Sequence, residues 1–152
     1  MNDTSVLRTA LIGFFAGAVA IVAFHQVGFL VLTQLGVIKA TTYAMTATKP
    51  LGVPLIFSYM FWGGLWGVVG AFLVPRLPAG LTGAVGWILF AMIVPTLANW
   101  FIVAPLKGAA LGNGFRAPGV YIAPLVYAFW GLGMWLLSEA LGRVWGGPRA
   151  AR

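Results

Sequence analysis

Two ionisable side chains, His25 and Glu139, lie within the long apolar runs of this sequence. Ionisable groups inside a membrane span are costly, and so each marks a candidate functional site. A histidine can ligate a metal or haem, or donate a hydrogen bond to a bound molecule. Glu139 precedes Arg143 by one helical turn, in the order that favours a side-chain ion pair. We therefore expect Glu139 and Arg143 to pair with each other and His25 to be the centre of any functional site.

His25 and the adjacent Gln26 are placed to begin a polar pocket. Counted from Leu11 along a helix, His25 lies about 21 Å into an apolar layer of about 30 Å, in its outer half. Polar residues of the third run and basic residues of the two long connections could complete the pocket. These are Thr96 and Asn99, together with Lys39, Tyr43, Lys49, Lys107 and Arg116. The alternative is that His25 only donates a hydrogen bond to the third run, to the Ala91 carbonyl or to Asn99, with the lysines at lipid headgroups.

The residue combinations typical of enzymes and metal sites are missing from this sequence. It has no cysteine, and a single histidine without nearby carboxylates cannot complete a metal site within one chain. Paired carboxylates and the motifs HExxH, GxSxG and GxxxxGK are absent. We therefore expect neither enzymatic activity nor a resident cofactor. Haem held by paired His25 side chains of two chains, or a quinone bound by His25, is kept as an alternative.

Composition identifies the class of protein that must position these residues. Of 152 residues, 61% are apolar and 7% are charged, against about a quarter charged in soluble domains. Four apolar runs reach the roughly 20 residues of a transmembrane helix. They are Thr9–Leu32, Leu51–Val74, Leu81–Ala104 and Val120–Leu141. The sequence therefore predicts an all-α polytopic membrane protein, with residues 1–152 forming a single membrane domain of four helices.

The net charge of +7 comes from basic residues scattered over every connection. This distribution is typical of membrane-flank anchors, and we expect no nucleic-acid partner. Five basic residues lie on the side of the termini and four on the other side. The positive-inside rule then favours an orientation with both termini in the cytoplasm.

Two stretches of the first half recur in the second half. AGAVAIVAF at residues 16–24 matches TGAVGWILF 66 residues later, and YMFWGG at residues 59–64 matches YAFWGL 68 residues later. Each half would then be one helical hairpin, at about 9–76 and about 81–143. Because a hairpin preserves chain direction, the two repeats should be parallel.

Small residues at helical spacing indicate where the helices approach one another. The expected packing residues are Gly13, Gly17, Gly63, Gly67 and Gly131, with the neighbouring Trp62 and Trp130. Ser138 and Gly142 have a similar spacing in the last run. Pro95 lies inside the third run and should kink it.

The stretches AFHQ, PLGVP and FWGGLWG, between Phe24 and Gly67, resemble those of small uncharacterised bacterial inner-membrane proteins. That resemblance implies no activity. We expect a non-enzymatic accessory or assembly subunit, or a lipid-facing helper. It would act in the bilayer as a homo-oligomer or with another membrane protein. The alternative is a small oligomeric transporter or channel for an anionic or neutral solute.

Overall fold

The structure is a computed structural model that describes residues 3–49, 51–106 and 108–146. It is all-helical, and within the described residues four helices are long and apolar enough to cross a membrane. We refer to them as spans 1 to 4. They are Asp3–Gln34, Leu55–Arg76, Gly83–Leu106 and Gly119–Trp145. The prediction of four apolar helices is confirmed.

Three of the four spans change their helical form along their length. Span 1 consists of α1 (Asp3–Ala20), a π-helical segment η1 (Ile21–His25) and α2 (Gln26–Gln34). Span 2 is α3 (Leu55–Leu73) followed by a short 3₁₀ turn (Val74–Arg76). Span 3 is α4 (Gly83–Ala98), a second π-helical segment η3 (Asn99–Val103) and α5 (Ala104–Leu106). A 3₁₀ turn, η4 (Leu111–Phe115), then leads to span 4, which is α6 (Gly119–Gly146).

Span 2 begins four residues later than the apolar run predicts. Gly52 has a φ of +69°, which a helix cannot contain, and a residue preceding proline is disfavoured in helical conformation. Pro54 has extended backbone and α3 begins at the following residue, Leu55. Leu51 therefore belongs to the connection.

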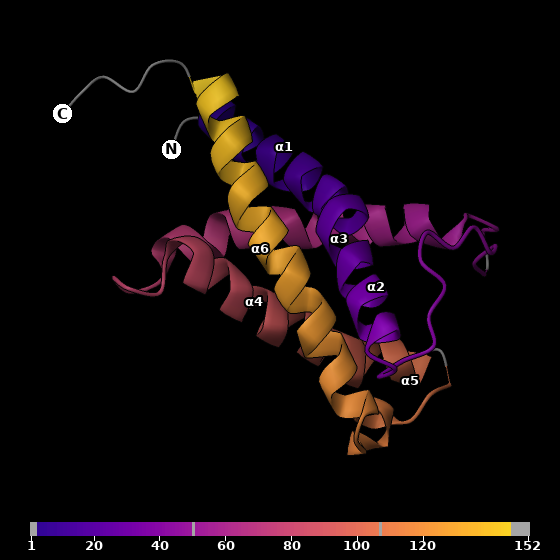
Figure 1. The fold of residues 1–152 in the computed structure, drawn as a ribbon. Coiled ribbons are helices and arrows are strands. Elements are labelled where there is room, and N and C mark those ends of the chain that lie inside the picture. Colours follow the sequence, from indigo (N-terminus) through magenta and orange to yellow (C-terminus); the bar gives the residue numbers. More distant parts are fainter. Residues whose placement is uncertain (1–2, 50, 107, 147–152) are drawn as a thin grey trace.

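Span 1 is the central helix of the arrangement. It packs against α3 on one side and against α6 on another, and α6 packs in turn against α4. Figure 1 shows α3 and α4 close together near their connection and diverging toward their other ends, with span 1 crossing α3 and α6 crossing both. At the close end, the Gly70 backbone meets the rings of Trp87 and Phe90. Spans 2 and 3 therefore form a wedge that opens toward the side of the two long connections.

Glycines allow α1 and α3 to touch at their backbones. A Cβ added to Gly13 would lie 2.7 Å from the carbonyl oxygen of Gly67, and one added to Gly17 would collide with the carbonyl oxygen of Gly63. Close contact of this kind replaces the apolar driving force, which is weak between helices in lipid. Gly142 has nothing within 4 Å of an added Cβ. The expectation that Gly142 packs against a neighbouring helix was therefore wrong, because that face of α6 meets no helix.

Large side chains of α6 fill the centre of the bundle. Trp130 and Met134 are 2% and 0% exposed. The indole Nε1 of Trp130 donates a hydrogen bond of 3.0 Å to the carbonyl oxygen of Gly17, and a Cβ on Gly131 would lie 2.7 Å from the carbonyl oxygen of Trp87. Trp62, at the corresponding place in the other sequence repeat, is 57% exposed. The two tryptophans therefore have different environments.

The ion pair expected at the end of span 4 is present. An Arg143 guanidinium nitrogen lies 3.8 Å from a carboxylate oxygen of Glu139, and their side chains are 76% and 46% exposed. A pair so exposed contributes about 0.3–0.5 kcal/mol. Arg76 at the end of span 2 donates to the carbonyl oxygen of Phe72 one turn earlier.

Candidate functional site

Each of the four spans contributes one polar residue to a single buried cluster. The imidazole of His25 lies with its ring centre 5.6 Å from that of Tyr59 and 5.9 Å from that of Tyr127. The Tyr127 side chain lies within interaction range of the Asn99 side chain. We call His25, Tyr59, Asn99 and Tyr127 the His25 cluster. His25 is 4% exposed, whereas its three partners are half-buried.

Phe29 completes an aromatic enclosure around the histidine. Its ring centre lies 4.8 Å from that of His25 in an edge-to-face arrangement, and 6.5 Å from that of Tyr59. Phe29 follows His25 by one helical turn, so both side chains project from the same face of span 1. The imidazole is therefore enclosed by rings from spans 1, 2 and 4.

Both π-helical segments adjoin the cluster. In span 1 the backbone N–H of Gln26 donates to the carbonyl oxygen of Ile21, five residues earlier. In span 3 the N–H of Ala104 donates to the carbonyl oxygen of Asn99 in the same way. His25 ends the first segment and Asn99 begins the second. Such segments are rare and are found frequently at functional sites.

The π-helical segment of span 1 also holds the connection between spans 1 and 2 in place. In a regular α-helix the Gln26 N–H would donate to the carbonyl oxygen of Val22. Here it donates to the carbonyl oxygen of Ile21, so the Val22 carbonyl lacks its usual partner. The hydroxyl of Tyr43 donates to that carbonyl oxygen at 3.0 Å, and the backbone N–H of Tyr43 donates to the side-chain oxygen of Gln26 at 2.8 Å. Residue 43 adopts a φ of +52°, an uncommon conformation for a tyrosine. Two hydrogen bonds therefore tie this connection to the helix at the level of His25.

The rest of this connection is ordered by its own hydrogen bonds. Thr48 exchanges backbone hydrogen bonds with Val53 and Gly52, and its hydroxyl donates to the Val53 carbonyl oxygen at 2.8 Å. The N–H groups of Leu55 and Ile56, at the start of α3, donate to the carbonyl oxygens of Thr46 and Ala44. The connection is therefore a folded loop anchored to both spans that it joins.

Three buried polar atoms near the cluster have no hydrogen-bond partner in the described part of the chain. They are Nδ1 of His25, the hydroxyl oxygen of Thr96 and Nε1 of Trp100. Thr96, Asn99 and Trp100 share one face of span 3 because they are spaced three and four residues apart. The prediction that His25 donates a hydrogen bond to Ala91 or Asn99 was wrong, since its Nδ1 has no partner among the described residues.

The basic residues of the predicted pocket do not join the cluster. Lys39, Lys49 and Arg116 have exposed side chains, and among the described residues they form no ion pair with an acidic group. Lys107 lies outside the described residues. Within the described part of the chain no group of three or more His, Cys, Asp or Glu side chains could hold a metal ion. The cluster itself carries no formal charge when His25 is neutral.

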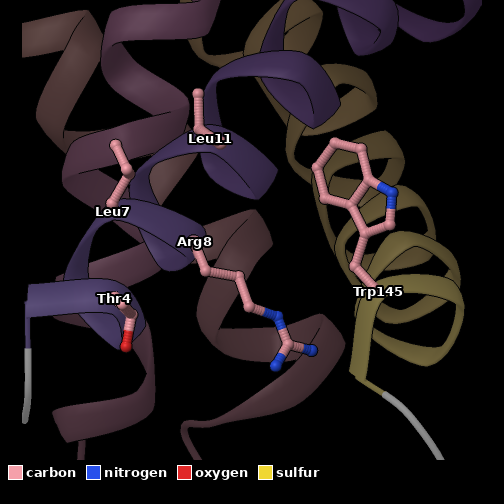
Figure 2. A pocket seen from close by; sticks show the side chains of 5 residues that line it. All are labelled: Thr4, Leu7, Arg8, Leu11 and Trp145. Carbon is pink, nitrogen blue, oxygen red and sulfur yellow. The ribbon is translucent and has the colours of Figure 1, made fainter.

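A groove of about 370 Å³ lies between the start of α1 and the end of α6. Figure 2 shows the side chains of Arg8 and Trp145 on its two sides, with Leu7 and Leu11 above Arg8. Arg8 precedes His25 by 17 positions, or about 25 Å of helix. This groove is therefore separate from the His25 cluster and lies at the terminal end of the bundle.

Comparison of the chain with protein families, with curated proteins and with solved structures found no match.

Sequence reasoning singled out His25, Gln26, Thr96 and Asn99 but missed Tyr59 and Tyr127 as site residues. The available signal was the repeated YMFWGG and YAFWGL stretches, whose first letters are these two tyrosines. Those stretches were interpreted as packing motifs because aromatic residues beside glycines are typical of helix contacts. The two recurring stretches therefore carried a signal for the site as well as for helix packing.

Replacing Tyr43 by phenylalanine should loosen the connection between spans 1 and 2. The substitution removes the hydrogen bond to the Val22 carbonyl, and such a bond contributes about 0.5–1.5 kcal/mol. We expect faster amide hydrogen exchange in residues 43–49, with the spans unchanged. Tyr121→Phe is the matched control, because Tyr121 is 60% exposed on α6. Equal exchange rates in the two variants would show that the Tyr43 hydroxyl does not hold this connection.

Proposed function

We propose that this chain is a non-enzymatic integral protein of the bacterial inner membrane that acts as an accessory or assembly subunit. Its termini lie in the cytoplasm, and its partners are the bilayer and either another membrane protein or further copies of itself. The resemblance of residues 24–67 to small bacterial inner-membrane proteins supports the location.

The observation that carries this proposal is the filled interior of the bundle. Trp130 and Met134 occupy the centre, with Ala16 and Ala20 of α1 at 0% exposure against them. The α1 and α3 backbones touch at glycines. A solute path along the axis of one chain would have to displace the Trp130 indole and break its hydrogen bond to Gly17. A closed bundle of this kind suits a helper better than a conduit.

The same packing limits the surfaces that a partner chain could contact. The glycines of α3 are occupied within the chain: Gly63 and Gly67 meet α1, and Gly64 meets the ring of Phe14. They are not free for contact with a second chain. Haem ligation by paired histidines is likewise disfavoured, because His25 is enclosed by Phe29, Tyr59 and Tyr127.

We also propose that the two hairpins are parallel repeats. Gly63 and Gly131 are equivalent in the repeat alignment. An added Cβ on Gly63 would meet the side chain of Ile21, and one on Gly131 would meet the backbone of Trp87, which is the residue that the alignment pairs with Ile21. Tyr59 and Tyr127 are also equivalent, and both flank His25. The contrast between exposed Trp62 and buried Trp130 then reflects divergence after duplication.

The proposal is tested by solute flux in vesicles containing the purified chain. Vesicles of phosphatidylethanolamine and phosphatidylglycerol with this protein should pass chloride and glycerol no faster than protein-free vesicles. The reason is that the bundle centre is filled by large side chains. Flux that rises in proportion to the protein content would favour the rival function, an oligomeric transporter or channel with its path between chains.

A further inference from the structure

We propose that the His25 cluster binds the head group of a quinone that enters sideways from the lipid bilayer. The proposal goes beyond the accessory role and does not depend on it. It rests on three features of the described residues: buried polar atoms without partners, a neutral aromatic enclosure, and the place of the cluster where spans 2 and 3 diverge.

The first feature is unsatisfied hydrogen-bonding capacity at the centre of the cluster. His25 is 4% exposed, and its Nδ1 has no partner among the described residues. A buried polar group without a partner costs about 1–3 kcal/mol, and a neutral imidazole has one donor and one acceptor nitrogen. The phenol groups of Tyr59 and Tyr127 are further donors beside it. A ligand with hydrogen-bonding oxygens would therefore recover free energy that the unliganded cluster lacks.

The second feature defines the chemical class of that ligand. Phe29, Tyr59 and Tyr127 surround the imidazole with planar rings, at centre distances of 4.8 to 5.9 Å from it. The nearest basic candidates, Lys39, Lys49 and Arg116, are exposed and lie outside the cluster. An anion would meet no opposite charge there, and a cation would meet no carboxylate. A neutral, planar ring with carbonyl oxygens matches this chemistry, and quinones are the membrane-soluble molecules of that kind.

The third feature is the position of Tyr59 and Asn99 on spans 2 and 3 where these two spans diverge. Spans 2 and 3 meet near Gly70 and Trp87 and diverge from there (Figure 1). Tyr59 and Asn99 are each about 16–18 Å along their helices from that meeting point, on the two arms of the wedge. Tyr59 and Asn99 are half-buried, whereas His25 is 4% exposed. A flat ring that reaches His25 from the lipid would therefore have to displace the side chains at this rim, with its apolar tail left among the lipids.

Binding of decylubiquinone to the chain in lipid nanodiscs tests this inference. We expect saturable binding of one molecule per chain, above the amount that protein-free nanodiscs retain. His25→Leu and Tyr127→Phe should each weaken binding about tenfold, the effect of losing one hydrogen bond of about 1.4 kcal/mol. Tyr121→Phe changes an exposed phenol on the same helix as Tyr127 and should leave the affinity unchanged.

Decylbenzene, which has the ring and tail without carbonyl oxygens, provides a test that needs no variant. A thousandfold excess should fail to displace decylubiquinone from the wild-type chain if the carbonyls are recognised. The inference is overturned if wild-type nanodiscs retain no more decylubiquinone than empty ones. It is also overturned if decylbenzene competes, or if folded His25→Leu and Tyr127→Phe bind as tightly as the wild type.

Discussion

Replacing Gly17 by alanine is expected to lower the free energy of unfolding by about 3 kcal/mol, the upper part of the range for overpacked contacts. The new Cβ would collide with the carbonyl oxygen of Gly63, which is part of the α3 backbone. A side chain could rotate away, but a helix backbone can yield only if the whole of α3 moves. The substitution should therefore separate span 1 from span 2. Unfolding in mixed detergent micelles would measure the loss.

Gly142→Ala is the matched control for this substitution. It makes the same change in a helix where nothing lies within 4 Å of the new Cβ. Alanine is a better helix former than glycine by about 1 kcal/mol in water, so this variant should be as stable as the wild type or more stable. If Gly17→Ala and Gly142→Ala unfold alike, the backbone contact between α1 and α3 does not hold the hairpin together.

Replacing Trp130 by alanine should cost about 3–5 kcal/mol, the usual loss for a large aromatic side chain in a packed core. Trp130 is 2% exposed and lies where α1, α4 and α6 meet. Trp130→Phe would separate the two contributions, because it keeps a ring and removes only the hydrogen bond to Gly17. That bond should contribute about 0.6–1.7 kcal/mol, as measured between helices in membranes.

Trp62 offers a matched control for Trp130. It occupies the corresponding place in the similar stretch YMFWGG but is 57% exposed, so Trp62→Ala should change stability by less than about 0.5 kcal/mol. The same unfolding assay would compare the two tryptophans. A similar loss for both would mean that Trp62 is as closely packed as Trp130, contrary to this structure.

The four helices could be predicted because each apolar run is longer than any soluble helix needs and carries almost no charge. The glycine contact between α1 and α3 was also predictable, because Gly13, Gly17, Gly63 and Gly67 have the four-residue spacing that places small residues on one face. The start of span 2 was not predictable, because an apolar run does not show where Gly52 and Pro54 interrupt the helical backbone. The different environments of Trp62 and Trp130 depend on which helix lies beside each, and the sequence around them is nearly the same.

Part of the candidate site was predictable for similar reasons. His25 was identifiable because an ionisable group in an apolar run is rare, and Asn99 because it is polar in another. The two π-helical segments have no signature in the composition. The first of them decides which carbonyl Tyr43 reaches. The lysines were assigned to the pocket because they share its side of the membrane, but side chains of that length extend to water or headgroups when nothing acidic holds them.

The accessory role is tested most directly by what accompanies the chain when native membranes are converted to nanodiscs without a separate detergent step. We predict a complex of fixed stoichiometry, either with one other membrane protein or with further copies of this chain, unchanged when the expression level is varied. A membrane partner should also become less abundant when the gene for this chain is deleted. Recovery of single chains, or of companions whose ratio follows the expression level, would contradict the proposed function.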